Sequence, residues 1–122
     1  MLRNKKPSLN ASDLARFKAE FFKALAHPLR IRIIDELRDG EVGVNGLCER
    51  LHVEQSTLSQ QLAQLRGRNI VVGRKEGQNV YYSIRDRAIF RLLDVAKEIF
   101  NNQLINVQDM LSQLEVSAGG PR

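Results

Sequence analysis

The chain has 122 residues, enough for one domain with a hydrophobic core but short for two. Hydrophobic residues make up 43% and charged residues 27%, which is typical of a globular domain and argues against general disorder. No apolar run reaches the roughly 20 residues that a membrane-spanning helix needs. The first seven residues lack the apolar segment of a secretory signal, and one cysteine excludes an internal disulfide framework. We therefore expect a cytoplasmic protein without a membrane partner.

The net charge of +5 suggests a polyanionic partner, because 19 Lys and Arg face 14 Asp and Glu. Basic residues dominate two segments. Residues 1–32 carry eight basic and two acidic side chains, and residues 53–87 carry six and three. Charge alone leaves two interpretations open, a solvated surface of mixed charge and a surface that binds nucleic acid.

The N-terminal quarter predicts an arm followed by a helix. Residues 1–11 have little periodicity and are expected to form a flexible basic arm. Ser12 is a favourable N-cap residue, so we expect the helix to start there. Its apolar residues recur at helical spacing and are Leu14, Phe17, Phe21 and Leu25, with Phe22 widening the stripe.

Two short helices are expected next. Proline suits the first position of a helix, so His27 is expected to cap a second helix that starts at Pro28. Gly40 is expected to be the C′ residue of that helix. A third helix is expected to turn Leu47, Cys48 and Leu51 inward.

A fourth helix is predicted from about residue 55 to residue 66. Leu58, Leu62 and Leu65 lie on one side of it and form a stripe that can be buried. The remaining face carries no charge and no bulky apolar group, although a merely solvated helix usually carries Glu and Lys. Its residues are Ser56, Thr57, Ser59, Gln60, Ala63 and Gln64.

A β-hairpin follows the fourth helix. Residues 70–74 and 80–84 are predicted strands, and residues 75–79 form a polar, basic turn that contains Gly77. The order of two short helices, a tight turn and a hairpin with a basic tip is that of a winged helix-turn-helix, a mainly α fold with a small β-hairpin.

A long helix is predicted from Asp86, as N-cap, to about Leu114, and residues 115–122 are expected to be a disordered tail. Its apolar stripe, together with extra apolar residues beside it, exceeds what a small monomer can bury, so we expect a homodimer. The domain is therefore expected to span residues 12–114. The predicted dimer interface consists of Leu14, Phe17, Phe21, Leu92, Val95, Ile99, Phe100, Leu104, Val107 and Leu111.

The fourth helix carries the functional prediction, because a helix fits the major groove and hydroxyl and amide side chains hydrogen-bond to base edges there. Glutamine can bond adenine through two hydrogen bonds, and arginine or lysine beside the helix can hold phosphates. The predicted DNA-binding residues are Gln55, Ser56, Thr57, Ser59, Gln60, Gln64, Arg66, Arg68, Arg74, Lys75, Gln78 and Asn79.

The sequence resembles the small winged-helix repressors of the arsenic-repressor (ArsR) type. The matching strings are FKALAHPLRIRIIDEL at residues 22–37, VNGLCERLHVEQSTLSQQLAQLR at residues 44–66 and GRKEGQNVYYSI at residues 73–84. The resemblance covers about residues 12–114. It implies a homodimer built on the first and last helices, a fourth helix that reads a double-stranded DNA operator, and a hairpin that acts as a wing.

The chain departs from the family's pattern in two respects. Gln60 and Gln61 stand where Arg-His is common, which removes a cation beside the phosphates. The Cys-x-Cys pair of arsenic sensors corresponds to Gly43 and Asn45, and no histidine follows His52 to complete a C-terminal zinc site with Asp94. We therefore expect neither a metal nor another cofactor.

Two alternatives remain beside a DNA-binding repressor. One is a winged-helix protein-interaction module that does not bind DNA. The other is a repressor that responds to redox state or to a small molecule through Cys48, although we expect this cysteine to pack as a small apolar residue. The sequence contains no Gly-rich phosphate loop and no cysteine–histidine pair at a catalytic spacing, so we do not expect an enzyme.

Overall fold

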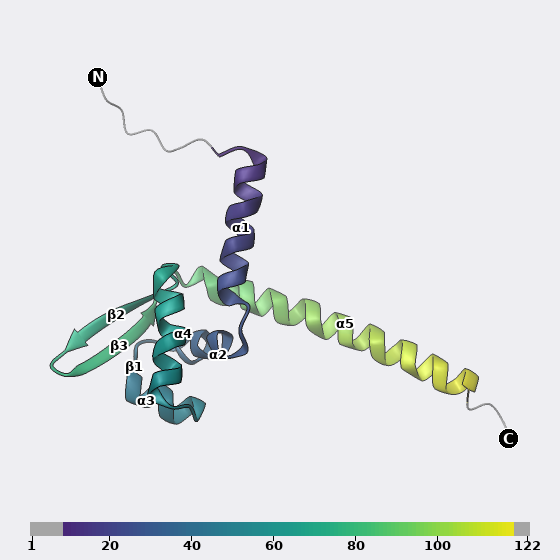
Figure 1. The fold of residues 1–122 in the computed structure, drawn as a ribbon. Coiled ribbons are helices and arrows are strands. Elements are labelled where there is room, and N and C mark those ends of the chain that lie inside the picture. The colour runs from purple at the N-terminus through teal and green to yellow at the C-terminus, as the bar shows by residue number, and fades with distance from the viewer. Residues whose placement is uncertain (1–8, 119–122) are drawn as a thin grey trace. The chain divides into compact units, whose positions relative to one another are not determined.

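The computed structural model describes residues 9–118, and the chain divides into two compact units, residues 1–85 and residues 86–122. Within the described residues, the first unit contains four helices and a three-stranded sheet, and the second is one long helix (Figure 1). The predicted winged helix-turn-helix is confirmed. None of the described helices is both long enough and apolar enough to cross a membrane.

Helix α1 spans Ala11–Leu25 and begins earlier than the sequence indicated. The N-cap is Asn10, whose side-chain oxygen accepts a hydrogen bond from the Asp13 backbone N–H at 2.8 Å. Ser12 therefore lies in the first turn, and the prediction that it caps the helix was wrong. The amide oxygen of Asn10 satisfies a free N–H of this turn, so the helix extends into what was predicted to be the arm. Residues 1–8 of that arm lie outside the described residues.

Helix α2 spans Pro28–Glu36 and starts as predicted. Pro28 occupies the first turn, and Nδ1 of His27 accepts a hydrogen bond from the Leu29 N–H at 3.1 Å, so His27 is the cap. The predicted end was wrong, because Leu37 is the C-cap and Gly40 lies three residues beyond it. Gly40 instead adopts a φ of +129° in the following turn, a conformation that favours glycine.

Helices α3 (Val44–Leu51) and α4 (Gln55–Gly67) are joined by a turn of three residues. His52 adopts the left-handed conformation with φ 54°, and the Val53 N–H donates to the Cys48 carbonyl at 3.1 Å. This closes the end of α3 and reverses the chain into α4. His52 is exposed in this turn.

The hairpin comprises β2 (Val71–Glu76) and β3 (Asn79–Ile84), with Gly77 in the turn at φ +63°. The short link at Val42–Gly43 is a third strand, β1, which pairs with β3 and gives an antiparallel sheet of order β1-β3-β2. In Figure 1 the β2–β3 hairpin projects away from α3 and α4 as a wing.

The core of the first unit lies between α2, α3, α4 and the base of the sheet. The three predicted leucines of α4 are 0–2% exposed, which confirms the buried stripe. The fully buried side chains are Ile33, Ile34, Leu37, Leu47, Leu58, Leu62, Leu65 and Val71. This core holds α4 with one face inward and the opposite face in solvent.

Helix α5 spans Ala88–Ala118. Asp86 caps it through its side chain, which accepts a hydrogen bond from the Ala88 N–H at 2.9 Å. The helix continues four residues beyond the predicted end at Leu114, so the prediction of a disordered tail from residue 115 was wrong for residues 115–118. Residues 88–118 contain no Gly or Pro, so no helix-breaking residue ends the helix before Gly119.

Candidate nucleic-acid interface

The exposed face of α4 is the centre of the candidate site. The buried leucine stripe fixes the rotation of the helix, so the residues between those leucines face solvent. None of their side chains hydrogen-bonds to another residue in the part of the chain that the structure describes. The exposed residues are Gln55, Ser56, Thr57, Ser59, Gln60, Ala63 and Gln64. Their donors and acceptors are free for a ligand.

Gln61 is the exception on this helix. It is half-buried, and its side-chain oxygen accepts a hydrogen bond from Nε of Arg30 at 2.9 Å. The same guanidinium donates to the Ala24 carbonyl at 2.8 Å, near the end of α1. Arg30 therefore links α1, α2 and α4, and Gln61 helps to hold α4 in place.

The wing contributes the second part of the site. Lys75 on β2 is exposed, and within the described residues it has no hydrogen bond or ion pair. Gln78 and Asn79, at the turn and the start of β3, are also exposed. These three residues place one free cation and two amides along the tip of the wing.

A cleft of about 430 Å³ lies between α3, the start of α4 and the wing. Gln55, Gln78 and Asn79 line it, so the structure brings together predicted residues from the helix and from the wing. None of the described residues that line the cleft is charged. The other lining residues are Gly43, Val44, Asn45, Gly46, Val80 and Tyr81.

Gly43 and Asn45, the positions that correspond to the arsenic-sensing cysteines, lie at this cleft. A Cβ atom on Gly43 would come within 3.2 Å of Cε1 of Tyr81, closer than an ordinary carbon contact. Glycine therefore allows β1 to lie directly against the tyrosine ring. Among the described residues, no group of three or more His, Cys, Asp and Glu is arranged to hold a metal ion. Cys48 is half-buried and has no disulfide partner.

Three of the four predicted phosphate-binding cations are engaged within the molecule. Arg66 donates to the hydroxyl of Tyr82 at 2.8 Å, which ties the end of α4 to β3. Arg68 forms an ion pair with Glu20 of α1 at 2.9 Å, with both side chains about half exposed. A guanidinium has five N–H groups, so both arginines retain free donors.

Arg74 is the most heavily engaged of the three. Its guanidinium donates to both carboxylate oxygens of Glu41, at 2.7 and 3.0 Å, and to Glu76 at 2.8 Å. These hydrogen bonds lower the pKa of Glu41 below its usual value, and attraction to the positive charge adds to the effect. The hydrogen bonds to the two glutamates raise the pKa of Arg74.

The local sequence pattern does not reveal all the partners of these arginines. Arg74 and Glu76 lie two residues apart on β2, so strand alternation indicates that they share a face. Glu41 is 33 residues away from Arg74 in the chain, and nothing in the local pattern connects them. Arg30 and Gln61 are likewise 31 residues apart.

Comparisons with known proteins agree with this geometry. The family model described as "Bacterial regulatory protein, arsR family" matches residues 27–72, which include α2, α3 and α4. An HTH-type transcriptional regulator of Mycobacterium tuberculosis, Rv0081, is 41% identical over 114 residues, covering 92% of this chain and 97% of that one. Its crystal structure superposes with a TM-score of 0.70 over 76% of this chain and 94% of that chain.

Two further relatives bear on function and assembly. A protein of a Synechocystis species described as a transcriptional repressor, SmtB homolog, is 38% identical over 91 residues, covering 75% of this chain and 69% of that one. The winged helix-turn-helix DNA-binding domain of Mb0332 from Mycobacterium bovis is homodimeric in solution. It is 28% identical, with a TM-score of 0.69 over 82% of this chain and 93% of that one.

Proposed function

This chain belongs to the arsR family of bacterial regulatory proteins and is a winged helix-turn-helix transcriptional regulator, and we propose that it is a cytoplasmic repressor that binds a palindromic DNA operator as a homodimer. The observation that carries the proposal is the exposed, uncharged polar face of α4 beside a wing with a free lysine. Relatives that are repressors or homodimers support the mode of action and the assembly.

Base reading is assigned to the middle of α4. The amides of Gln60 and Gln64 can each hydrogen-bond to a base edge in the major groove, and Ala63 between them lets the helix approach closely. Gln55, Ser56, Thr57 and Ser59 can serve either bases or phosphates near the start of the helix. This division follows from the side chains, because amides distinguish bases whereas hydroxyls bond equally well to phosphate.

Phosphate contact is assigned to the wing and to the end of α4. Lys75 is exposed and without a partner among the described residues, so it can approach a phosphate at no cost in lost contacts. Arg66 and Arg68 can use the donors that their internal contacts leave free. Gln78 and Asn79 would follow the backbone from the wing tip.

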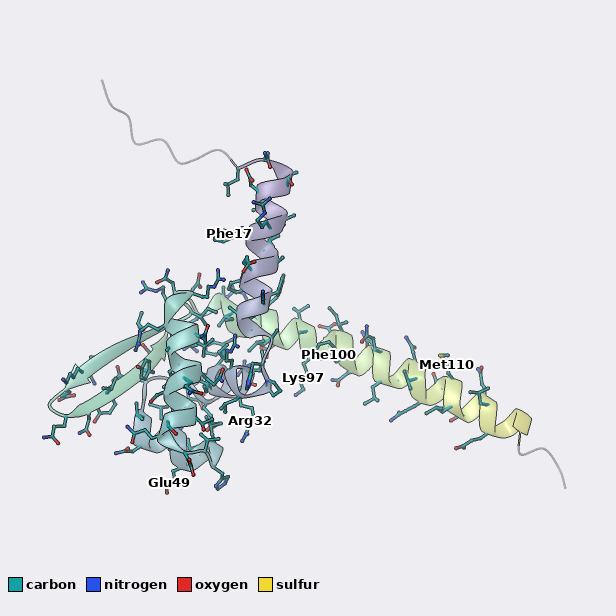
Figure 2. The ribbon with its side chains drawn as sticks, viewed as in Figure 1. Phe17, Arg32, Glu49, Lys97, Phe100 and Met110 are labelled. Carbon is teal, nitrogen blue, oxygen red and sulfur yellow. The ribbon has the colours of Figure 1, made fainter. Side chains whose placement is uncertain are left out.

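Dimerisation is assigned to α1 and α5, because both carry large exposed apolar side chains. Figure 2 shows Phe17 projecting from α1, and Phe100 and Met110 projecting from α5. Phe17 is 69% exposed and Phe100 63% exposed, unusually high for phenylalanine. The proposed interface consists of Leu14, Phe17, Phe21, Leu92, Val95, Ile99, Phe100, Leu104, Val107 and Leu111.

Selection of binding sites from a random duplex pool tests this function. A homodimer with two reading helices should enrich two inverted half-sites whose centres lie about one helical turn, roughly 34–36 Å, or a multiple of it apart. A pool with no enriched sequence would contradict operator recognition and favour a winged-helix module that binds proteins. A single enriched half-site would contradict the dimer.

A further inference from the structure

The wing contains two neighbouring cations that differ in their ion-pair partners. Lys75 is exposed and has no partner among the described residues, whereas Arg74 uses three of its N–H groups on two carboxylates. Both residues lie on β2, the strand that leads to the wing tip. The positive charge of the wing is therefore neutralised at Arg74 and free at Lys75.

The sheet fixes this arrangement. Arg74 on β2 is directly opposite Tyr81 on β3, and Tyr81 is opposite Gly43 on β1. The guanidinium carbon of Arg74 lies 4.9 Å from the centre of the Tyr81 ring. The side chain thus crosses β3 on an aromatic surface and reaches Glu41, the residue before β1. Stacking and paired hydrogen bonds hold the guanidinium in one orientation.

The local charge disfavours a phosphate. Two carboxylates beside one guanidinium leave a net charge of −1, so a phosphate that approaches Arg74 meets repulsion until a carboxylate is displaced. Arg74 is nevertheless on the wing, which the proposed function places against the DNA backbone. An arginine in this position would otherwise be expected to add to phosphate binding.

We propose that Glu41 and Glu76 form an acidic latch that holds Arg74 away from DNA phosphates and thereby limits the affinity and salt dependence of DNA binding by the wing. The proposal rests on the proposed function, because it presumes that the wing faces the DNA backbone. It assigns Glu41 and Glu76 as positioning residues that act through Arg74. Lys75 is then the wing's free basic contact.

The test compares release of the latch in two backgrounds. The double variant Glu41→Gln/Glu76→Gln keeps side chains of similar size and removes both negative charges. The matched control makes the same two substitutions in an Arg74→Gln background, which removes the same charges but has no arginine to release. Affinity for a random duplex is measured across a salt series for each chain, with circular dichroism and thermal melting as folding controls.

One additional phosphate contact makes the slope of log affinity against log salt steeper by about 0.9. Between 1 M and 0.15 M salt, this slope corresponds to a gain in affinity of roughly fivefold. At 0.15 M salt, the double variant should therefore gain about fivefold more affinity for random duplex than the loss of two negative charges alone would give. Its salt slope should be steeper by about one. In the Arg74→Gln background, only the smaller effect of charge removal should remain.

Equal effects in the two backgrounds would overturn the latch. They would mean that Arg74 is no more available after release than before. A wild-type chain that binds no duplex at all, measured in the same titrations, would instead contradict the proposed function. The two failures are therefore distinguishable.

Discussion

Gln60 and Gln61 show how adjacent identical residues acquire different roles. Gln60 is exposed and without a partner in the described structure, whereas Gln61 is half-buried and bonded to Arg30. The helical period explains the difference, because successive residues are rotated by about 100° around the axis. Sequence periodicity predicted the exposed face, but it could not predict that Gln61 would accept a hydrogen bond from a residue 31 positions away.

Substitution of Gln60 tests base reading. Gln60→Ala should weaken operator binding by about 1–3 kcal/mol, because it removes the proposed bidentate base contact, and should hardly change binding to random duplex.

Lys75→Ala should weaken binding to both duplexes and lower the salt slope by about one, because it removes the proposed phosphate contact. Fluorescence anisotropy titrations of both duplexes across a salt series measure both effects.

Gln61→Ala is the matched control for Gln60→Ala. It removes the same side chain one position further on, where the loss leaves Nε of Arg30 without its acceptor. We expect it to lower the free energy of unfolding by about 1–2 kcal/mol, whereas Gln60→Ala should leave this quantity unchanged. Unchanged operator preference in Gln60→Ala would show that another face of the protein reads the DNA.

The carboxyl group of Glu41 should titrate at a lower pH than an ordinary glutamate. Hydrogen bonds from Arg74 favour the charged carboxylate and lower the pKa of Glu41 from its ordinary value near 4.5. Because the folded-state pKa is depressed, the latch contributes stability above the ordinary pKa and loses it only as the pH falls through the lower folded-state value. The latch should thus stay closed and charged throughout the neutral range.

An NMR titration of the Glu41 carboxyl carbon measures this effect. The midpoint should lie below 4.5 in the wild-type chain. In Arg74→Gln, the midpoint should return towards the ordinary value, since the donor that stabilises the carboxylate is gone. The same midpoint in both chains would show that Arg74 and Glu41 are not bonded in solution.

Among the helices and strands, sequence periodicity predicted the features that repeat and missed those that depend on a single distant contact. The leucines of α4 and the alternation of the hairpin repeat over several residues, so they are visible in the sequence alone. The pairing of β1 with β3 involves only two residues and depends on Gly43 lying against Tyr81. The cap is Asn10 and not Ser12. The sequence could not distinguish the two, because both residue types are good caps.

Helix α5 carries the prediction about assembly. Leu104 and Leu111 are 56% and 54% exposed, and both belong to the proposed dimer interface. Leu104→Gln/Leu111→Gln should weaken the dimer by about 3 kcal/mol or more, over a hundredfold in dissociation constant, because each leucine contributes about 1.5–3 kcal/mol when buried. Sedimentation equilibrium at micromolar concentration measures the change.

The wild-type chain should sediment at twice its mass of 13.9 kDa. Asn102→Ala/Asn106→Ala is the control, since it changes exposed polar positions of the same helix and should leave the dimer intact. A wild-type monomer at this concentration would contradict the dimer. Equal dissociation constants for the leucine variant and the wild type would place the interface elsewhere.

Regulation of DNA binding should not depend on the metals that a Cys-x-Cys pair or a C-terminal histidine site would bind. Gly43 and Asn45 replace the two thiolates, and Gly43 lies too close to Tyr81 to accept a side chain without displacing the ring. Stoichiometric zinc or arsenite should therefore leave the affinity for the operator unchanged. Release by zinc that a chelator reverses would reveal a site that these residues do not provide.

We propose that the polar face of α4 recognises a particular DNA sequence. The most direct test is the ratio of two dissociation constants at about 0.15 M salt, one for a selected operator and one for a shuffled duplex of the same composition. Specific regulators bind their sites at least roughly 10³-fold more tightly than other DNA, and we expect a ratio of that size here. Equal affinity for the two duplexes would contradict sequence recognition by α4.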